Sequence, residues 1–385
     1  MISVDWGDGK IVTAGTSEQA YDGWDGDVEV SGTATGTVRI YSTGTVTHFS
    51  CVNKSALGAA GLTSLDISNA KDLTELEANG NYLTEFDFSQ NKSLAKVYLN
   101  NNCLTSVSLN TAVTYLNLQN NRLTSFDGSI APTLSTIYLS DNTALGNLDL
   151  SKNTSLKSVY AINAGITSLK LGANATKSLY VSVNDNPGLT SLDVTEATGL
   201  GNKGRLFATN CNLTELKYSS IATANVSNNK FTLSSLPTAN ITNLTYAPQK
   251  DMEIEDISGV IDLSSQAFVG DAATVYSWYA ASGNDAQSLS EGTDYKVDGG
   301  KFTFLKDFDA VYCAMSNEAL PKFSGNDIFK TVTVRATASS TTGIFGIEDV
   351  DAKAPVFTIN GVSAGNYGKL PAGIYVRNGK KFVVK

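Results

Sequence analysis

The sequence predicts a mainly β protein whose central part is a solenoid with a long parallel sheet on its concave side. Three observations support this fold class. A template of the form L-x-x-L-x-L-x-x-N-x-L recurs between Val46 and Lys250, at steps of about 21 residues. Asparagine returns at the same template position in most copies. Only 17% of the residues are charged, and Asn, Thr, Ser and Gly take their place, as in turn-rich β proteins.

The repeats extend over residues 46–250, and this template is the leucine-rich-repeat pattern. A looser first copy begins at Val46. The first template position of the later copies is held by Leu73, Leu94, Val113, Leu134, Leu156, Ser178, Lys203, Ile221 and Ile241. Pairs such as Leu116 and Leu118 alternate inward on a short strand. Because one coil cannot bury its own apolar face, the coils are expected to stack into a continuous core.

Two further features of the repeat have structural roles. The recurring asparagines are expected to satisfy backbone groups that each tight bend leaves unpaired. They are Asn81, Asn102, Asn121, Asn142, Asn186 and Asn229. The second half of each copy, as in LTEFDFS, forms the opposite wall. It lacks helical periodicity, so we expect extended segments or 3₁₀ turns there.

Residues 1–45 precede the clear repeats and are expected to form a β cap over the open end of the solenoid. This segment is rich in aspartate, which raises the possibility of a calcium site. The residues concerned are Asp5, Asp8, Asp22, Asp25 and Asp27. Their spacing matches neither the EF-hand nor the nonapeptide calcium pattern, so we prefer the interpretation that they are turn-forming and solvated carboxylates.

Two β segments follow the repeats. Residues 251–337 contain short strand-like runs spaced as in a small β-sandwich. Trp278 and Cys313 lie on two of these runs, in a pattern that resembles an immunoglobulin-like domain. The pattern departs from that family at Val311, where a tyrosine is usual, and in lacking a partner cysteine. Residues 338–385 are expected to form a linker and a small C-terminal β module, with a hairpin turn at NGKK.

Several segments resemble a group of known surface proteins. The motifs LTSLDIS and LTSLDVT, with intervening N-x-L-T, resemble internalin-like leucine-rich-repeat proteins, especially those of gut Bacteroidetes. The opening VDWGDG and the run AVYCAMSN look like flanking modules of that group. The tail LPAGIYVRNGKKFVVK is similar to C-terminal modules of secreted Bacteroidetes proteins. The resemblance implies export to the cell surface or beyond, a leader peptide already removed, and a binding role.

Composition argues against several other functions. The net charge of −9 argues against nucleic-acid binding, and no apolar run is long enough to span a membrane. The four cysteines form no C-x-x-C pair, so we expect buried free thiols and no metal. His48 is the only histidine, which disfavours nucleophilic triads and zinc sites. No phosphate-binding glycine motif occurs. We expect neither enzymatic activity nor a cofactor.

The candidate ligand site comes from the repeat register, which directs alternate strand residues away from the core. An aromatic patch is expected on the concave face of the middle coils, at Tyr98, Tyr115, Tyr138, Tyr160, Tyr180 and Phe207. Asn117, Lys96 and Arg205 flank it. Such a patch suits a protein interface. The alternatives are a glycan-binding surface, rings that only stabilise an exposed sheet in a structural spacer, and, more remotely, a hydrolase.

Overall fold

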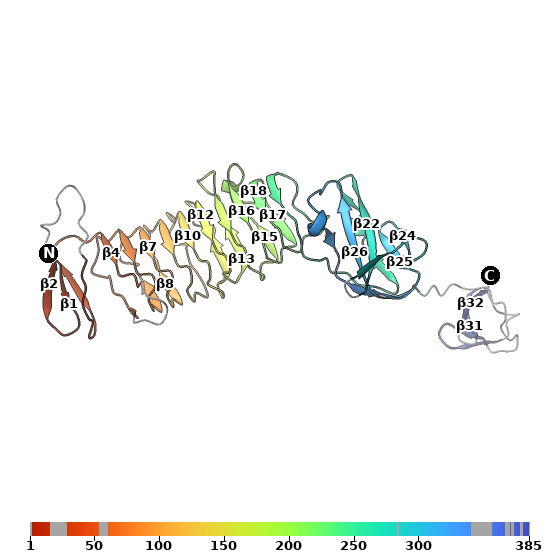
Figure 1. Cartoon of the computed structure of the whole chain (residues 1–385), viewed down its shortest axis with the longest axis horizontal. Helices are drawn as coiled ribbons and strands as arrows, with labels where there is room; N and C mark the ends of the chain where they lie inside the picture. The colour runs from red at the N-terminus through yellow and green to blue at the C-terminus, as the bar shows by residue number, and fades with distance from the viewer. Residues whose placement is uncertain are drawn as a thin grey trace. The chain divides into compact units, whose positions relative to one another are not determined.

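The computed structural model describes residues 2–15, 29–53, 61–282, 285–339, 356–365, 370, 373–377 and 380–384. The chain divides into two compact units, Met1–Lys250 and Asp251–Lys385. The first contains the solenoid, which begins beside the N-terminus in Figure 1. The second contains the remaining β segments. Each unit is described by itself.

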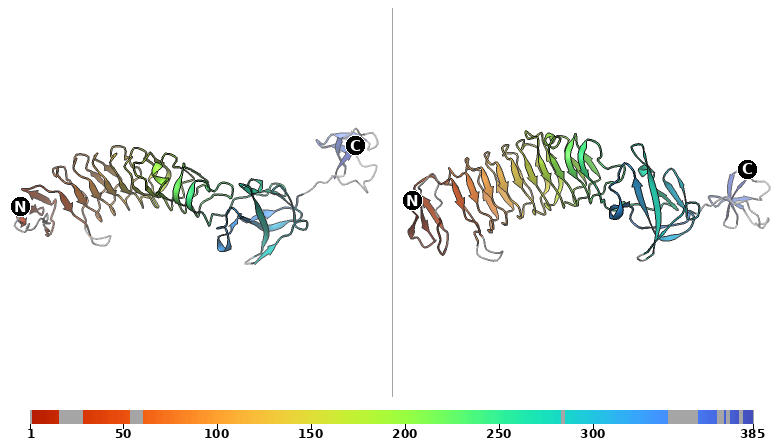
Figure 2. Two further views of the ribbon diagram at one scale, coloured as in Figure 1. Left: turned by 90° about the horizontal axis from the view of Figure 1, so that it is seen from above. Right: turned by 45° about the horizontal axis from the view of Figure 1, so that its top comes forward.

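Ten parallel strands, one from each coil, form the main sheet of the solenoid. In chain order they are β4 (His48–Ser50), β5 (Glu75–Glu77), β7 (Lys96–Tyr98), β9 (Tyr115–Asn117), β10 (Thr136–Tyr138), β12 (Ser158–Tyr160), β14 (Tyr180–Ser182), β16 (Arg205–Phe207), β18 (Ile221–Asn225) and β19 (Ile241–Thr245). Each pairs in register with the next, so that Ile137 lies beside both Leu116 and Val159. The two views of Figure 2 show the coils stacked side by side. The predicted leucine-rich-repeat solenoid is confirmed.

The opposite wall is made of shorter pieces. Three two-stranded parallel sheets are described there. They pair β6 (Glu85–Asp87) with β8 (Ser106–Ser108), β11 (Gly146–Leu150) with β13 (Ile166–Leu171), and β15 (Ser191–Asp193) with β17 (Glu215–Lys217). A short 3₁₀ helix, η2 (Thr198–Leu200), lies in the longer glycine-rich coil. This wall is therefore extended with a 3₁₀ turn, as its lack of helical periodicity predicts.

Both walls direct apolar side chains into one core. Leu76, Leu116 and Ile137 of the main sheet are fully buried, and so is Phe88 of the opposite wall. Burying a side chain of this size contributes about 1.5–3 kcal/mol. The core is continuous from coil to coil because every copy supplies the same inward positions.

The predicted asparagine column is a buried ladder of hydrogen bonds. Asn142 donates through Nδ2 to the carbonyl oxygens of Leu118 (3.0 Å) and Leu139 (2.9 Å), and its Oδ1 accepts the N–H of Leu123 at 3.1 Å. One amide thus satisfies backbone groups of two successive coils. Where the ladder position holds cysteine, the Cys211 thiol donates to the Val183 carbonyl at 3.3 Å. In the last coil, Gln249 takes over, with Oε1 accepting from two backbone amides.

Two more polar columns belong to the fold, and the sequence analysis did not identify them. Buried Asn91, Asn110 and Asn153 donate to carbonyl groups on the opposite wall. In seven coils, the residue before the ladder position is an Asn or Asp with a left-handed backbone, with φ between 49° and 61°. These residues are Asn101, Asn120, Asp141, Asn163, Asp185, Asn210 and Asn228. Asn and Asp adopt this conformation at lower cost than other non-glycine residues.

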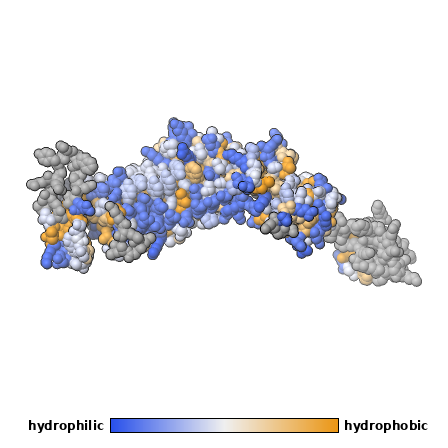
Figure 3. Space-filling view, viewed as in Figure 1, coloured by the Kyte–Doolittle hydropathy of each residue, from blue (hydrophilic) through white to orange (hydrophobic). Residues whose placement is uncertain are grey.

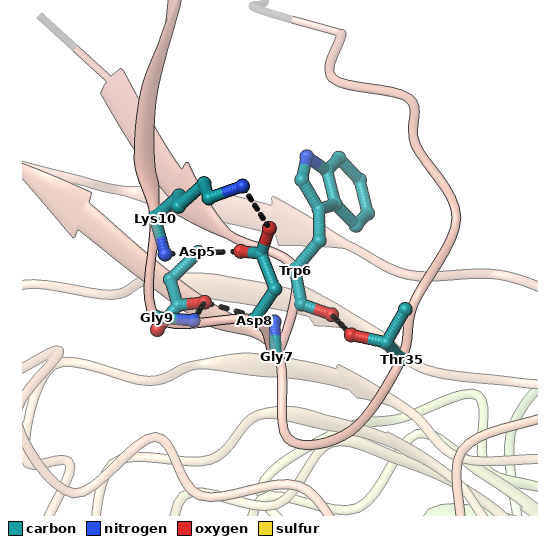
Figure 4. Close-up of polar contacts among 7 residues, drawn as sticks. All are labelled: Asp5, Trp6, Gly7, Asp8, Gly9, Lys10 and Thr35. Carbon is teal, nitrogen blue, oxygen red and sulfur yellow. Dashed lines mark hydrogen bonds and ion pairs between the residues drawn. The ribbon is translucent and has the colours of Figure 1, made fainter.

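The N-terminal segment forms a three-stranded antiparallel sheet of β1 (Ile2–Asp5), β2 (Ile11–Gly15) and β3 (Arg39–Ser42). In the turn after β1, Asp5 accepts the N–H groups of Gly7 (2.8 Å) and Gly9 (3.0 Å), as Figure 4 shows. Its second oxygen lies 3.7 Å from Arg39. Asp5 is thus a turn residue with a structural role. The expected aspartates at positions 22, 25 and 27 lie outside the described residues.

The second unit contains two sheets that pack face to face. One is β20 (Val260–Asp262), β25 (Lys301–Phe304) and β24 (Tyr295–Asp298). The other centres on β22 (Ala272–Ser282) and β26 (Phe308–Asn317), with β21 (Phe268–Val269), β23 (Asp285–Ser288), β27 (Phe329–Lys330) and β28 (Val334–Ala336). Fully buried Trp278 packs edge-to-face on Phe302 and Phe304 across the two sheets. Cys313, beside Trp278, is a free thiol. The immunoglobulin-like assignment stays a prediction.

A small C-terminal sheet completes the second unit. It contains β29 (Val356–Thr358), β30 (Ser363–Gly365), β31 (Gly373–Arg377) and β32 (Lys380–Val384) in the order β30-β29-β31-β32. β31 and β32 pair antiparallel from Gly373↔Val384 to Arg377↔Lys380. This pairing is the hairpin that NGKK predicts, although the turn residues themselves lie outside the described ranges.

Replacing one ladder asparagine should destabilise the solenoid strongly. Asn142→Ala leaves buried carbonyl and amide groups of two coils without partners, each at a cost of about 1–3 kcal/mol. We expect the free energy of unfolding to fall by about 2 kcal/mol or more in urea denaturation. Exposed Asn147 of the same coil is the control, because it bonds only surface hydroxyls. Equal destabilisation by Asn142→Ala and Asn147→Ala would contradict the role assigned to the ladder.

Candidate functional site

Six aromatic rings on the outward face of the main sheet form one continuous row, here called the tyrosine ladder. Its members are Tyr98, Tyr115, Tyr138, Tyr160, Tyr180 and Phe207. Successive ring centroids lie 4.8, 5.7, 4.5, 5.0 and 5.4 Å apart. The structure therefore brings all six sequence-predicted rings together.

The in-register sheet explains why the rings meet. Tyr115 and Tyr180 occupy the first residue of their strands, whereas the other four rings occupy the third. Tyr98 lies beside Asn117 in the register, so its ring reaches Tyr115 diagonally. Diagonal neighbours of this kind are within reach of aromatic side chains. All six rings are half-buried, mostly by one another.

Stacking determines which part of each ring is presented. Tyr138 and Tyr160 are parallel within 1°, and the other pairs are tilted by 35° to 49°. Tyr138 and Tyr160 therefore cover one face of each other, whereas the tilted pairs cover one another only in part. The ladder is thus an apolar strip that also carries the five hydroxyl groups of its tyrosines.

Burial within the ladder affects the ionisation of its hydroxyl groups. Desolvation is the main cause that raises the pKa of Tyr115 to about 12, and the neighbouring Tyr138 and Tyr98 add to it. Desolvation also raises the pKa of Tyr98 and of Tyr160. These three phenols therefore stay neutral and able to donate a hydrogen bond at physiological pH.

The polar residues around the ladder differ at its two ends. Beside Tyr98, Lys96 donates to Glu75 at 3.0 Å, and this contact raises the pKa of Lys96. At the other end, exposed Arg205 forms no ion pair within the described residues. Between them, Asn117 accepts the N–H of Gln119 through Oδ1 at 3.1 Å. Of the three predicted flanking residues, Lys96 is thus paired with a carboxylate, Arg205 is an unpaired cation, and Asn117 is a neutral amide.

The only histidine of the sequence lies beside a carboxylate at the edge of the main sheet. His48 Nε2 lies 4.0 Å from Glu77 Oε2, and the same carboxylate accepts the Ser50 hydroxyl at 3.0 Å. These groups are at the rim of the sheet in contact with solvent. Across the described ranges, no group of three or more His, Cys, Asp or Glu side chains is placed to hold a metal ion.

Some outward positions are less accessible than the register alone indicates. Ser182 is only 1% exposed, although it lies on the same face as the rings. It sits in the register between Tyr160 and Phe207, whose larger side chains cover it. Ser140 is also buried, and its hydroxyl oxygen accepts the N–H of Ile162. Neither serine contributes to the accessible surface of the site.

Comparisons with known proteins return leucine-rich-repeat structures. The functional domain of InlJ from Listeria monocytogenes, described as including a cysteine ladder, is 21% identical over 76% of this chain and 67% of its own, with a TM-score of 0.35. The APL1 leucine-rich repeat domain is 17% identical over 63% of this chain and 56% of its own, with a TM-score of 0.33. No protein-family model matches the sequence, and no curated protein matches it. The fold assignment rests on the register and ladders of the chain itself.

None of the helices in the described part of the chain has the length and apolar character needed to cross a bilayer.

The raised tyrosine pKa values predict a loss of stability at alkaline pH. A group whose pKa is higher in the folded than in the unfolded state contributes stability below its unfolded value, which is about 10 for tyrosine. That contribution disappears as the pH rises from about 10 towards 12, the folded value of Tyr115. We expect Tyr115→Phe to lose less stability than wild type over this range, measured by urea denaturation at each pH. Identical pH profiles of the two proteins would refute the assignment.

Proposed function

We propose that this chain is a non-enzymatic binding protein that engages a protein partner through the tyrosine ladder. The observation that carries the proposal is the continuous row of six half-buried rings, five of which carry a hydroxyl group. Tyrosine provides large, rigid contact area and a hydrogen bond at little cost in side-chain entropy, and it is enriched in protein interfaces. A charge-poor strip with polar residues around it matches the composition of such interfaces.

The position of the rings supports a binding role beyond stabilising the sheet. The ladder occupies consecutive coils from β7 to β16, with a ring in each. The outward residues of the flanking strands are polar, as in Glu75 and Glu77 of β5 or Thr223 and Asn225 of β18. If stacking served stability alone, the same side chains would suit the terminal coils equally well. Confinement to the middle coils is what a discrete contact surface requires.

The same geometry disfavours a glycan-binding platform on the ladder. A sugar that stacks on tyrosine needs an open ring face, but at the centre of the ladder Tyr138 and Tyr160 cover one face of each other at 4.5 Å. The hydroxyl groups and the exposed parts of the rings suit contacts with protein backbone and side chains. We therefore propose a protein, in preference to a glycan, as the ligand of this surface.

We further propose that the protein acts outside the cell or on its surface. The support is the resemblance of its repeats, its opening and its tail to modules of exported proteins. Antibody labelling of intact source cells, compared with permeabilised cells, tests the location. Labelling of intact cells at a similar level is expected, and signal only after permeabilisation would contradict export.

Removing two central rings should abolish partner binding. Tyr138→Ala with Tyr160→Ala deletes the parallel pair at the middle of the ladder. Central aromatic residues of an interface each contribute about 2 kcal/mol or more, so Kd should rise by about 30-fold for one ring and by about 700-fold for both if the contributions add. Wild type and variant would be used for affinity capture from host and bacterial extracts, followed by Kd measurement with each purified protein captured. Circular dichroism checks that the variant folds, because stacked pairs also stabilise the sheet by about 0.5–1.5 kcal/mol each.

The matched control is the stacked pair Tyr279 and Tyr312 in the second unit, with centroids 5.3 Å apart. Replacing both by alanine makes the same chemical change away from the solenoid. The partner should bind this control as it binds wild type. A second variant, Tyr138→Phe with Tyr160→Phe, keeps the stacked rings and should weaken binding less than alanine does. A partner whose Kd is unchanged by the alanine variant would disprove the proposed surface.

A further inference from the structure

A second surface lies beside the tyrosine ladder, on the flank of the solenoid where the strands begin. We propose that this flank binds an anionic polysaccharide, a chain of sugars carrying carboxylate or sulfate groups. The proposal does not depend on the function assigned to the ladder. Its three components are a groove lined with hydroxyl groups, a lysine within the groove, and a row of uncompensated cations that continues it.

The groove is shallow, has a volume of about 750 Å³ and extends over four consecutive coils. Six of its lining residues are serine or threonine, and the others are Tyr115, Ala175 and Lys157. No carboxylate lines it. In a protein with a net charge of −9, a groove without acidic residues and with one ammonium group is electrostatically distinct.

Several of the hydroxyl groups are available to a ligand. Thr133 uses its hydroxyl to bond backbone carbonyls of the preceding coil at 3.0 and 3.1 Å, which fixes the wall of the groove. The side-chain hydroxyls of Ser135, Thr136 and Ser155, by contrast, have no hydrogen-bond partner among the residues that the structure describes. Each of them can donate one hydrogen bond and accept others. The groove therefore offers a set of unused polar groups matched to sugar hydroxyls.

The cations continue from the groove towards the C-terminal coils. The Lys157 carbonyl accepts the N–H of Tyr180, and the Lys177 carbonyl accepts the N–H of Lys203 at 3.1 Å, so these lysines lie on adjoining coils. Arg205 follows two residues after Lys203. All four cationic side chains are exposed, and none is in an ion pair with another described residue.

Some cations elsewhere on the solenoid are paired with a carboxylate and others are not. On the opposite wall, Lys170 lies 3.8 Å from Asp149, and Lys217 lies 3.4 Å from Glu215, whereas Lys92 forms no ion pair within the described residues. What distinguishes the strand-start flank is that four unpaired cations follow one another on adjoining coils. A repeating anion supplies their counter-charge and gains from binding several cations at once.

The combination favours a polysaccharide over an acidic peptide segment. The carboxylates of either ligand could pair with the four cations of the protein. The hydroxyl groups of the groove can also bond neutral donors and acceptors that lie between the charges of a ligand. In a polysaccharide, the sugar hydroxyls supply such neutral groups on every residue. Most of the residues that line the groove carry hydroxyl groups and one carries an ammonium group, so recognition here relies on hydrogen bonds and charge.

The test uses polygalacturonate as a carboxylated polysaccharide, dextran as a neutral one and poly-L-glutamate as an acidic polypeptide. Binding to the full chain is measured by calorimetry at low and at moderate salt. We expect polygalacturonate to bind, dextran not to bind, and the affinity to fall as salt increases. Polygalacturonate should also bind more tightly than poly-L-glutamate of equal charge. Equal affinity for the two polyanions, or no binding of polygalacturonate, would overturn the proposal.

Two variants locate the site. Lys157→Gln, Lys177→Gln and Lys203→Gln together should weaken polygalacturonate binding by about tenfold or more, from three lost surface contacts. The control Lys92→Gln, Lys152→Gln and Lys217→Gln makes the same change of net charge on the opposite wall and should leave affinity unchanged. Ser135→Ala with Ser155→Ala should weaken polygalacturonate but not poly-L-glutamate. Equal losses in the flank and control variants would show non-specific attraction and refute the site.

Binding of a protein partner to the ladder is a separate measurement. The three lysines of the flank variant are not part of the ladder, and the ladder tyrosines replaced by alanine do not line the groove. If the binding proposal for one surface fails its test, the proposal for the other surface can still be tested by itself.

Discussion

The structure depends on the hydrogen bonding that holds one coil in register with the next. Each ladder asparagine bonds its own coil and the one before, as when Asn102 donates to the carbonyls of Leu99 and Ala78 at 3.0 Å. These groups are buried, so a coil displaced by one residue would leave several of them unpaired. The ladder thus sets the phase of every strand. That phase in turn decides which side chains enter the core and which face solvent.

The tyrosine ladder follows from this phase and also contributes to it. Tyr138 lies directly beside Tyr160 in the register, and the other pairs are diagonal, so the rings can meet only if the strands stay in register. Each pair adds stability, and the parallel pair also covers one face of each of its rings. The feature that stabilises the sheet therefore limits the ligands it can bind. In the view of Figure 3 the solenoid surface is mainly hydrophilic, with apolar colour in small areas. A strip of half-buried rings and hydroxyl groups in such a surface is suited to a partner with its own polar groups.

Sequence reasoning predicted the parts of the molecule that periodicity controls. The inward leucines, the Asn142 ladder and the outward position of the rings all follow from one repeating template. The stacking of Tyr138 on Tyr160 was not predicted, because ring orientation depends on neighbouring side chains. The second column, which includes Asn91, lies outside the eleven-residue template on which the prediction was based. A recurring asparagine three residues before the first leucine of the next copy, as at Asn91 and Asn153, was the signal for it. The groove was missed because its serines and threonines come from four different coils.

Acidic and basic residues gather at opposite ends of the outward face of the main sheet. Glu75 and Glu77 lie at the β5 end of the ladder, whereas Lys177, Lys203 and Arg205 gather near β16. Charges arranged in this way act mainly on association rate and orientation, because exposed groups contribute little net affinity. A partner lying along the ladder would place its basic end over β5 and its acidic end over β16. Tyr115 belongs to both the ladder and the groove, so a polysaccharide filling the groove would contact the same coil as that partner. The two surfaces are thus adjacent, and occupation of one restricts the volume open to a ligand at the other.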